Sequence, residues 1–80
     1  MTVNEAVRQR IFDLCLAENI SINKLSNLSG VTQSTVNNIV SGRNHSTTIS
    51  TIKKLCDGLN ISVQEFFNSD LFTSLEQELK

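Results

Sequence analysis

Apolar residues recur at intervals of three and four along almost the whole chain, and no proline interrupts them. The first run consists of Val3, Val7, Ile11, Leu14 and Cys15. This spacing places all five on one face of a helix over about residues 4–18. Because the same intervals continue through the later segments, the sequence predicts an all-α fold.

Residues that favour helix ends divide the next stretch into two short helices. Ser21 can cap a helix that stops at Gly30, since glycine readily adopts the left-handed backbone that a helix end needs. Thr32 can cap the following helix, which is expected to end at Gly42. Two short helices joined by a tight turn are therefore predicted.

The last third of the chain holds two more predicted helices and a tail. Apolar residues indicate a fourth helix over 49–59, and Ser62-Val63-Gln64-Glu65 is typical of a capping box that opens a fifth. The tail either continues as an amphipathic helix through Leu71, Leu75 and Leu79 or frays, because its acidic end opposes the helix macrodipole. We expect one five-helix domain over residues 1–68 and an acidic amphipathic tail over residues 69–80.

Composition argues against several classes of function. One histidine and two separated cysteines offer too few ligands for a zinc site and little basis for a catalytic triad. The three glycines are isolated, so no phosphate-binding loop is present. No secretory signal and no apolar run of about 20 residues, the length of a membrane span, occur. We therefore expect a cytoplasmic protein that is not an enzyme and has no cofactor, metal, small-molecule ligand or membrane partner.

Charge is distributed unevenly along the chain. Residues 1–56 carry six cationic and three acidic residues, net +3, whereas residues 57–80 carry one and five, net −4. No acidic residue occurs from Asn19 through Cys56, and this stretch is rich in Asn, Ser, Thr and Gln. A polyanion can approach such a face without repulsion, and short amides and hydroxyls reach phosphates and base edges. Helix caps and polar loops alone would account for the same enrichment.

The segment from Ser21 to Gly42 carries the functional signal. Its two helices meet through a tight turn at residues 29–31, where Val31 is expected to fill the angle between them. The cap leaves the next helical turn free to present Gln33 and Ser34. This is a helix-turn-helix pattern, in which the first residues of the second helix lie against base edges in the major groove.

At these residues the chain resembles the lambda-repressor/Cro-like helix-turn-helix family, the XRE-type regulators of bacteria and phages. The resemblance covers about residues 7–67, because it extends beyond the turn to the family's fourth and fifth helices. The segment that is similar to these two helices is Thr51-Ile52-Lys53-Lys54-Leu55-Cys56-Asp57-Gly58-Leu59-Asn60-Ile61-Ser62-Val63-Gln64-Glu65-Phe66-Phe67. It implies a lambda-repressor-like domain that binds double-stranded DNA in a bacterial or phage-encoded transcriptional regulator.

The resemblance also implies roles for individual residues. Four side chains of the third helix match the family's base-reading positions: Gln33, Ser34, Asn37 and Asn38. Since Gln and Asn amides pair with adenine, we expect A·T steps in the site. Phosphate contacts are implied around the second and third helices and the loop that follows, at Asn23, Lys24, Thr32, Thr35, Arg43, Asn44 and His45. Lys53 and Lys54 are the weakest candidates, since both could belong to a solvated helix face.

Two departures from the family pattern matter. Relatives commonly have Gln where this chain has Ile22, which cannot contact phosphate, so the contact is expected to shift to Asn23, Lys24 or the helix N-terminus. Many relatives also pair an Arg with a Glu beneath the surface, where Cys15 and Val40 stand here. Apolar replacement of a buried ion pair is often neutral, so we expect the same architecture with both cysteines as small buried hydrophobes.

These observations favour a repressor that binds an inverted-repeat operator as a homodimer. So few cations predict weak binding by one domain, which makes two half-sites necessary. The apolar surface of the fifth helix and tail is the expected dimer contact. The alternative is an antitoxin-like or coactivator-like protein-interaction module, which the net charge of −1 and the leucine stripe favour and the acid-free third helix disfavours.

Phe12 and Leu16 form an apolar pair on the first helix that needs a cover. The leucine stripe of the tail is the nearest free apolar surface. We therefore predict a helix over residues 70–80 that lies against the first helix, from the same chain or from a dimer partner.

Overall fold

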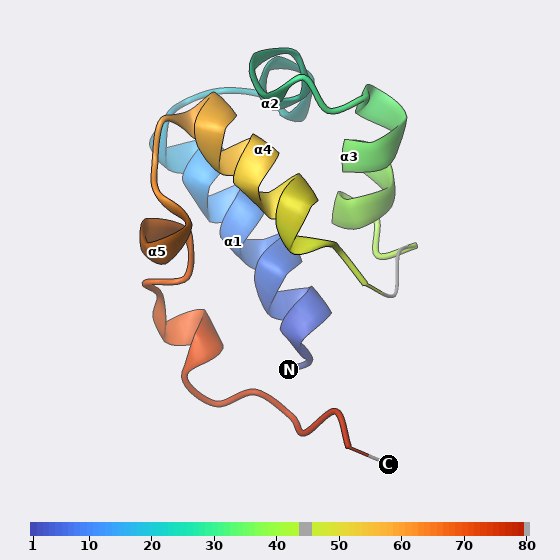
Figure 1. Cartoon of the computed structure of the whole chain (residues 1–80), viewed down its shortest axis with the longest axis vertical. Coiled ribbons are helices and arrows are strands. Elements are labelled where there is room, and N and C mark those ends of the chain that lie inside the picture. The colour runs from blue at the N-terminus through green and yellow to red at the C-terminus, as the bar shows by residue number, and fades with distance from the viewer. Residues whose placement is uncertain (44–45, 80) are drawn as a thin grey trace.

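The computed structural model describes residues 1–43 and 46–79, and its helices follow the predicted order (Figure 1). The five α-helices are α1 Val3–Ala17, α2 Ile22–Ser29, α3 Gln33–Val40, α4 Ile49–Leu59 and α5 Val63–Phe66. One 3₁₀ turn, η1, follows at Asp70–Phe72. The predicted all-α, five-helix architecture is confirmed.

Side-chain caps set where these helices begin. Hydroxyl groups accept the backbone N–H three residues ahead at the three predicted N-caps, Ser21, Thr32 and Ser62. Only this half of the predicted capping box forms at α5, where the Glu65 N–H donates to Ser62. The complete box opens α1 instead, because the Thr2 hydroxyl accepts the Glu5 N–H at 3.1 Å and the Glu5 carboxylate accepts the Thr2 N–H at 2.8 Å. The start of α1 is therefore more firmly fixed than its sequence pattern predicted.

The core lies at the centre of the domain, where buried side chains from all five α-helices meet. The helix α2 crosses one end, while α3 and α5 lie on opposite sides. The largest of the essentially inaccessible side chains are those of Ile11, Leu25, Val36, Leu55, Cys56 and Phe66. Since full burial of a large apolar side chain contributes roughly 1.5–3 kcal/mol, this small core holds all five helices together.

The helices α4 and α2 approach each other closely at Gly58. A methyl group added at Gly58 would lie 2.8 Å from both the Cα and the backbone nitrogen of Ser29. Only a residue without a side chain allows the two backbones to pack at this distance. Gly58 therefore allows α2, the first helix of the predicted helix-turn-helix, to pack closely against α4.

A contact that the sequence did not suggest holds the short helix α5. The Arg10 guanidinium donates from Nε to the Phe66 carbonyl at 2.7 Å and from Nη2 to the Glu65 carbonyl at 2.9 Å. The last carbonyls of a helix have no partners within it, and one helical turn is not stable alone. Arg10 thus supplies both the missing donors and a tether from α1.

The predicted tail helix is wrong. Beyond η1, residues 75–79 form no helix, and Leu79 is 86% exposed. Phe72 turns inward to pack edge-on against Phe67, with ring centroids 4.9 Å apart, and this contact ends the helical path. An acidic C-terminal end would also have opposed the macrodipole of a longer helix.

The tail consequently leaves the apolar pair of α1 uncovered within the chain. Phe12 is 41% exposed and Leu16 is 81% exposed. Their predicted cover by residues 70–80 of the same molecule is therefore wrong, because η1 packs against α1 while the leucine stripe that follows is not helical. Cover by a partner chain stays a prediction.

Candidate nucleic-acid interface

The turn between α2 and α3 is built as the sequence predicted. Gly30 adopts the left-handed conformation, with φ of 70°, and its N–H closes α2 on the Ser26 carbonyl at 3.1 Å. Val31 is buried in the angle between the helices. The buried Ser26 hydroxyl donates to the Val31 carbonyl at 2.6 Å, a contact that the sequence analysis missed. This bond and the cap at Thr32 fix the direction in which α3 leaves the turn.

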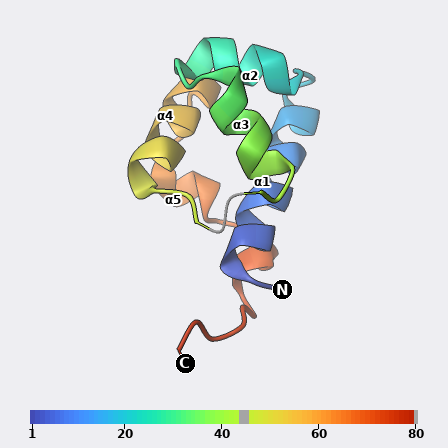
Figure 2. The same ribbon diagram turned by 90° about the vertical axis from the view of Figure 1, so that its right-hand side faces the viewer.

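The helix α3 lies at the front of the molecule in Figure 2. One side of this helix is buried and the other is polar. Val36 and Ile39 lie in the core. The four predicted base-reading residues form two pairs at i and i+4, one of Gln33 with Asn37 and one of Ser34 with Asn38. Gln33, Ser34 and Asn37 are exposed, and Asn38 is half-buried. The polar side of α3 therefore presents amides and a hydroxyl without any carboxylate of its own.

The first turns of α2 and α3 meet through their side chains. The Gln33 Nε2 donates to the Asn23 Oδ1. This bond joins a predicted base-reading residue to a predicted phosphate-binding residue ten positions earlier in the chain. It orients the Gln33 amide, whose oxygen and second N–H stay available for a further partner.

Ile22 follows its apolar character. Its side chain is half-buried and packs against the core. The exposed side chains at the start of α2 are those of Asn23 and Lys24. Cys15 and Cys56 are free and buried, and burial raises the pKa of each thiol. Val40 is half-buried beside the core. The prediction that apolar residues replace the family's buried ion pair is consistent with this packing.

The remaining predicted phosphate contacts lie at the edges of α3. Thr32 and Thr35 bond to each other through their hydroxyls at 2.9 Å within the cap, and Thr32 is exposed. Arg43 is exposed directly after Gly42, which ends the α3 turn with φ of 79°. Asn44 and His45, two further predicted contacts, lie outside the described residues.

The two lysines of α4 differ from each other. Lys53 forms an ion pair with Asp57 one helical turn later, and this hydrogen bond raises the pKa of Lys53. Lys54 is exposed. Because Lys53 already has an acidic partner, it is a poor candidate for DNA phosphate, in agreement with its low rank from the sequence.

With this geometry established, comparison with known proteins identifies the class. The Cro/C1-type HTH DNA-binding domain matches residues 10–70. The chain belongs to this family of DNA-binding domains.

Among solved structures, the chain is similar to the prophage Lp1 protein 11. The two are 37% identical in sequence and superpose with a TM-score of 0.81, over 94% of this chain and 99% of that one. The search of curated proteins found no match. None of the described helices is long and apolar enough to cross a membrane.

Proposed function

We propose that this chain is a sequence-specific transcriptional regulator whose α3 reads base edges in the major groove. The observation that carries the proposal is the two-sided character of α3, with Gln33, Ser34 and Asn37 exposed opposite Val36 and Ile39 in the core. Bidentate contacts from the Gln and Asn amides to adenine would select DNA sites that contain A·T steps. Asn38 would complete the reading surface.

Phosphate contacts would hold the duplex on both sides of α3. Asn23 and Lys24 lie on the first turn of α2, and Arg43 follows α3. Thr32 and Thr35, at the α3 cap, together with Asn44 and His45, complete the proposed set. Such contacts fix register and orientation, while the side chains of α3 specify sequence.

The proposed biological unit is a homodimer on an inverted repeat, acting as a cytoplasmic repressor that occupies its operator. The chain has only seven Lys and Arg residues against eight acidic ones, so one domain supplies little counterion release. Two linked half-sites raise the affinity without new contacts. Sedimentation should show a dimer at tens of micromolar, at least on DNA, and a monomer under both conditions would refute this part.

Selection of bound sites from a random DNA pool tests the proposed function. The expected result is an enriched A·T-containing inverted repeat, bound at least about 10³-fold more tightly than random duplex at the same salt. Affinity for both duplexes should fall as salt increases. Failure to enrich any sequence would refute specific recognition.

A protein-interaction module on the same fold is the second candidate. It is favoured by the apolar pair Phe12 and Leu16 on α1, both of which are exposed. The absence of any duplex binding at about 50 mM salt, where phosphate contacts are strong, would favour this alternative over the regulator.

A further inference from the structure

Four parts of the chain, one of them Thr47 just before α4, line an open hollow of about 330 Å³ at the edge of the candidate interface. Arg8 and Glu5 line it from α1, Gly42 from the turn after α3, and Glu78 from the tail. The turn belongs to the acid-free stretch of the sequence, and the fold brings two carboxylates beside it. The hollow is therefore a place where cationic and acidic groups face the region proposed to meet DNA.

Arg8 lies directly against the turn that carries Arg43. A Cβ added at Gly42 would lie 2.7 Å from the Arg8 Nη1, so the guanidinium sits immediately beside that backbone. Within residues 1–43 and 46–79, no hydrogen bond or ion pair joins the Arg8 side chain to another residue, and its charge acts on Glu5, whose pKa it helps to lower, from across the hollow. Arg8 is thus a half-buried cation with free donors at the rim of the interface.

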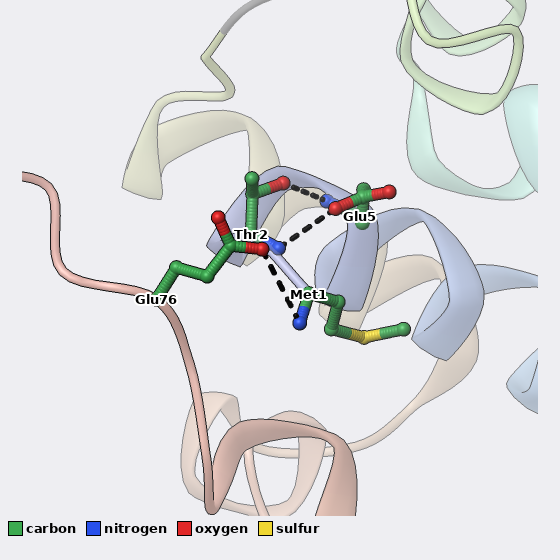
Figure 3. A network of polar contacts seen from close by, with 4 residues as sticks. All are labelled: Met1, Thr2, Glu5 and Glu76. Carbon is green, nitrogen blue, oxygen red and sulfur yellow. Dashed lines mark hydrogen bonds and ion pairs between the residues drawn. The ribbon is translucent and has the colours of Figure 1, made fainter.

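The tail is held across the start of α1 by a main-chain contact and a charge contact, and Figure 3 shows the charge contact between Glu76 and Met1. The Glu76 N–H donates to the Met1 carbonyl at 3.1 Å, and the Glu76 carboxylate lies 3.5 Å from the Met1 amine. These contacts place Glu78, two residues later, in the same hollow as Arg8. The tail therefore carries an acidic side chain to the one end of α1 that adjoins the turn after α3.

We propose that Arg8 is a further phosphate-binding residue of the DNA interface and that Glu78 is its competitor within the chain. The proposal rests on the proposed DNA binding and adds to it a regulating contact. A guanidinium binds carboxylate and phosphate oxygens with the same forked set of donors, so the two anions exclude each other. Because phosphate contacts carry no sequence information, Glu78 should weaken binding to all duplexes alike.

A double-mutant cycle on the full chain tests this competition. The variants are Glu78→Gln, Arg8→Gln and both together, measured by fluorescence anisotropy on a random-sequence duplex as salt increases. Glu65→Gln is the matched control, since Glu65 is an exposed acid on α5, on the opposite side of the molecule from α3 (Figure 1). Thermal melting of each variant establishes that it is folded.

The expected result is about threefold tighter binding by Glu78→Gln at about 50 mM salt, the scale of one unit charge acting over several ångströms in water. Arg8→Gln should bind more weakly and reduce the salt slope by about one. In the Arg8→Gln background, Glu78→Gln should have no further effect.

Three outcomes would overturn the competition while leaving the proposed function intact. In the first, Glu78→Gln changes the affinity for the duplex only as much as Glu65→Gln does. In the second, Glu78→Gln increases the affinity equally with Arg8 present and with Arg8 replaced. In the third, Arg8→Gln binds the duplex as tightly as the parent. If the parent chain binds no duplex at any salt, the proposed function fails together with this inference.

Discussion

Replacement of Gly58 by alanine tests whether the close approach of α4 to α2 fixes the position of the helix-turn-helix on the rest of the domain. Alanine in the interior of a helix normally stabilises it by about 1 kcal/mol relative to glycine. At Gly58, however, the new methyl group would lie 2.8 Å from the Ser29 Cα and nitrogen and 2.9 Å from its Cβ. These atoms belong to the backbone of α2 and its first side-chain carbon, so they cannot move aside without moving the helix.

The magnitude follows from the balance of these two effects. Overpacking in a well-packed interior costs about 1–3 kcal/mol, and a backbone obstacle places Gly58→Ala at the upper end of that range. After subtraction of the helix-propensity gain, a net loss of about 1–2 kcal/mol is expected. For a domain of this size each kcal/mol lowers the melting temperature by about 4–8 °C, so the midpoint should fall by about 5–15 °C.

Thermal and urea denaturation followed by circular dichroism measure this loss. Lys54→Ala is the matched control, because it adds the same residue to an exposed position of α4. At a temperature where Gly58→Ala is fully folded, its affinity for a selected DNA site should also fall, since a displaced α2 displaces α3. A melting temperature equal to or above that of the parent would refute the reasoning and show that helix propensity outweighs the contact with Ser29.

Four further predictions follow from the site and the fold. Gln33→Ala and Asn38→Ala should each cost about 1–3 kcal/mol of base discrimination in anisotropy titrations without lowering the melting temperature, and unchanged affinity for the selected site would show that α3 is not the reader. Arg43→Ala should weaken binding to all duplexes and reduce the salt slope by about one, whereas a loss confined to one sequence would contradict a phosphate role. Arg10→Met leaves the Phe66 and Glu65 carbonyls without their donor and should lower the free energy of unfolding by roughly 1–3 kcal/mol, which an unchanged urea midpoint would exclude. Hydrogen bonds from the Thr2 backbone and side chain lower the pKa of Glu5 below its ordinary value of 4.5, so the ionised Glu5 stabilises the fold fully above pH 4.5 and loses this effect as the pH falls through the folded-state pKa. The melting temperature of Glu5→Gln should therefore fall less than that of the parent as the pH is lowered through this range. An equal fall in the melting temperatures of the two proteins would contradict this role of Glu5.

Much of the candidate site could be predicted from the sequence because it depends on short-range signals. The caps at Ser21 and Thr32, the left-handed Gly30 and the buried Val31 all involve residues within a few positions of one another. The exposed face of α3 follows from the helical period alone. The tail was the exception, since its leucine spacing suits a helix but the packing of Phe72 against Phe67 ends the helical path.

The sequence by itself determined the five α-helices and the caps at Ser21, Thr32 and Ser62, since these depend on local backbone preferences and on apolar periodicity, and its motifs indicated the class of DNA-binding domain by resemblance. Only the tertiary structure decided which distant groups meet: Gln33 with Asn23, Arg10 with the end of α5, and Gly58 with Ser29. The same holds for Glu78, which the fold carries to the hollow beside Arg8 although no acid lies near that turn in the sequence. The physical reason is that these contacts depend on the packing of all five helices around one core, which fixes positions that no local spacing encodes.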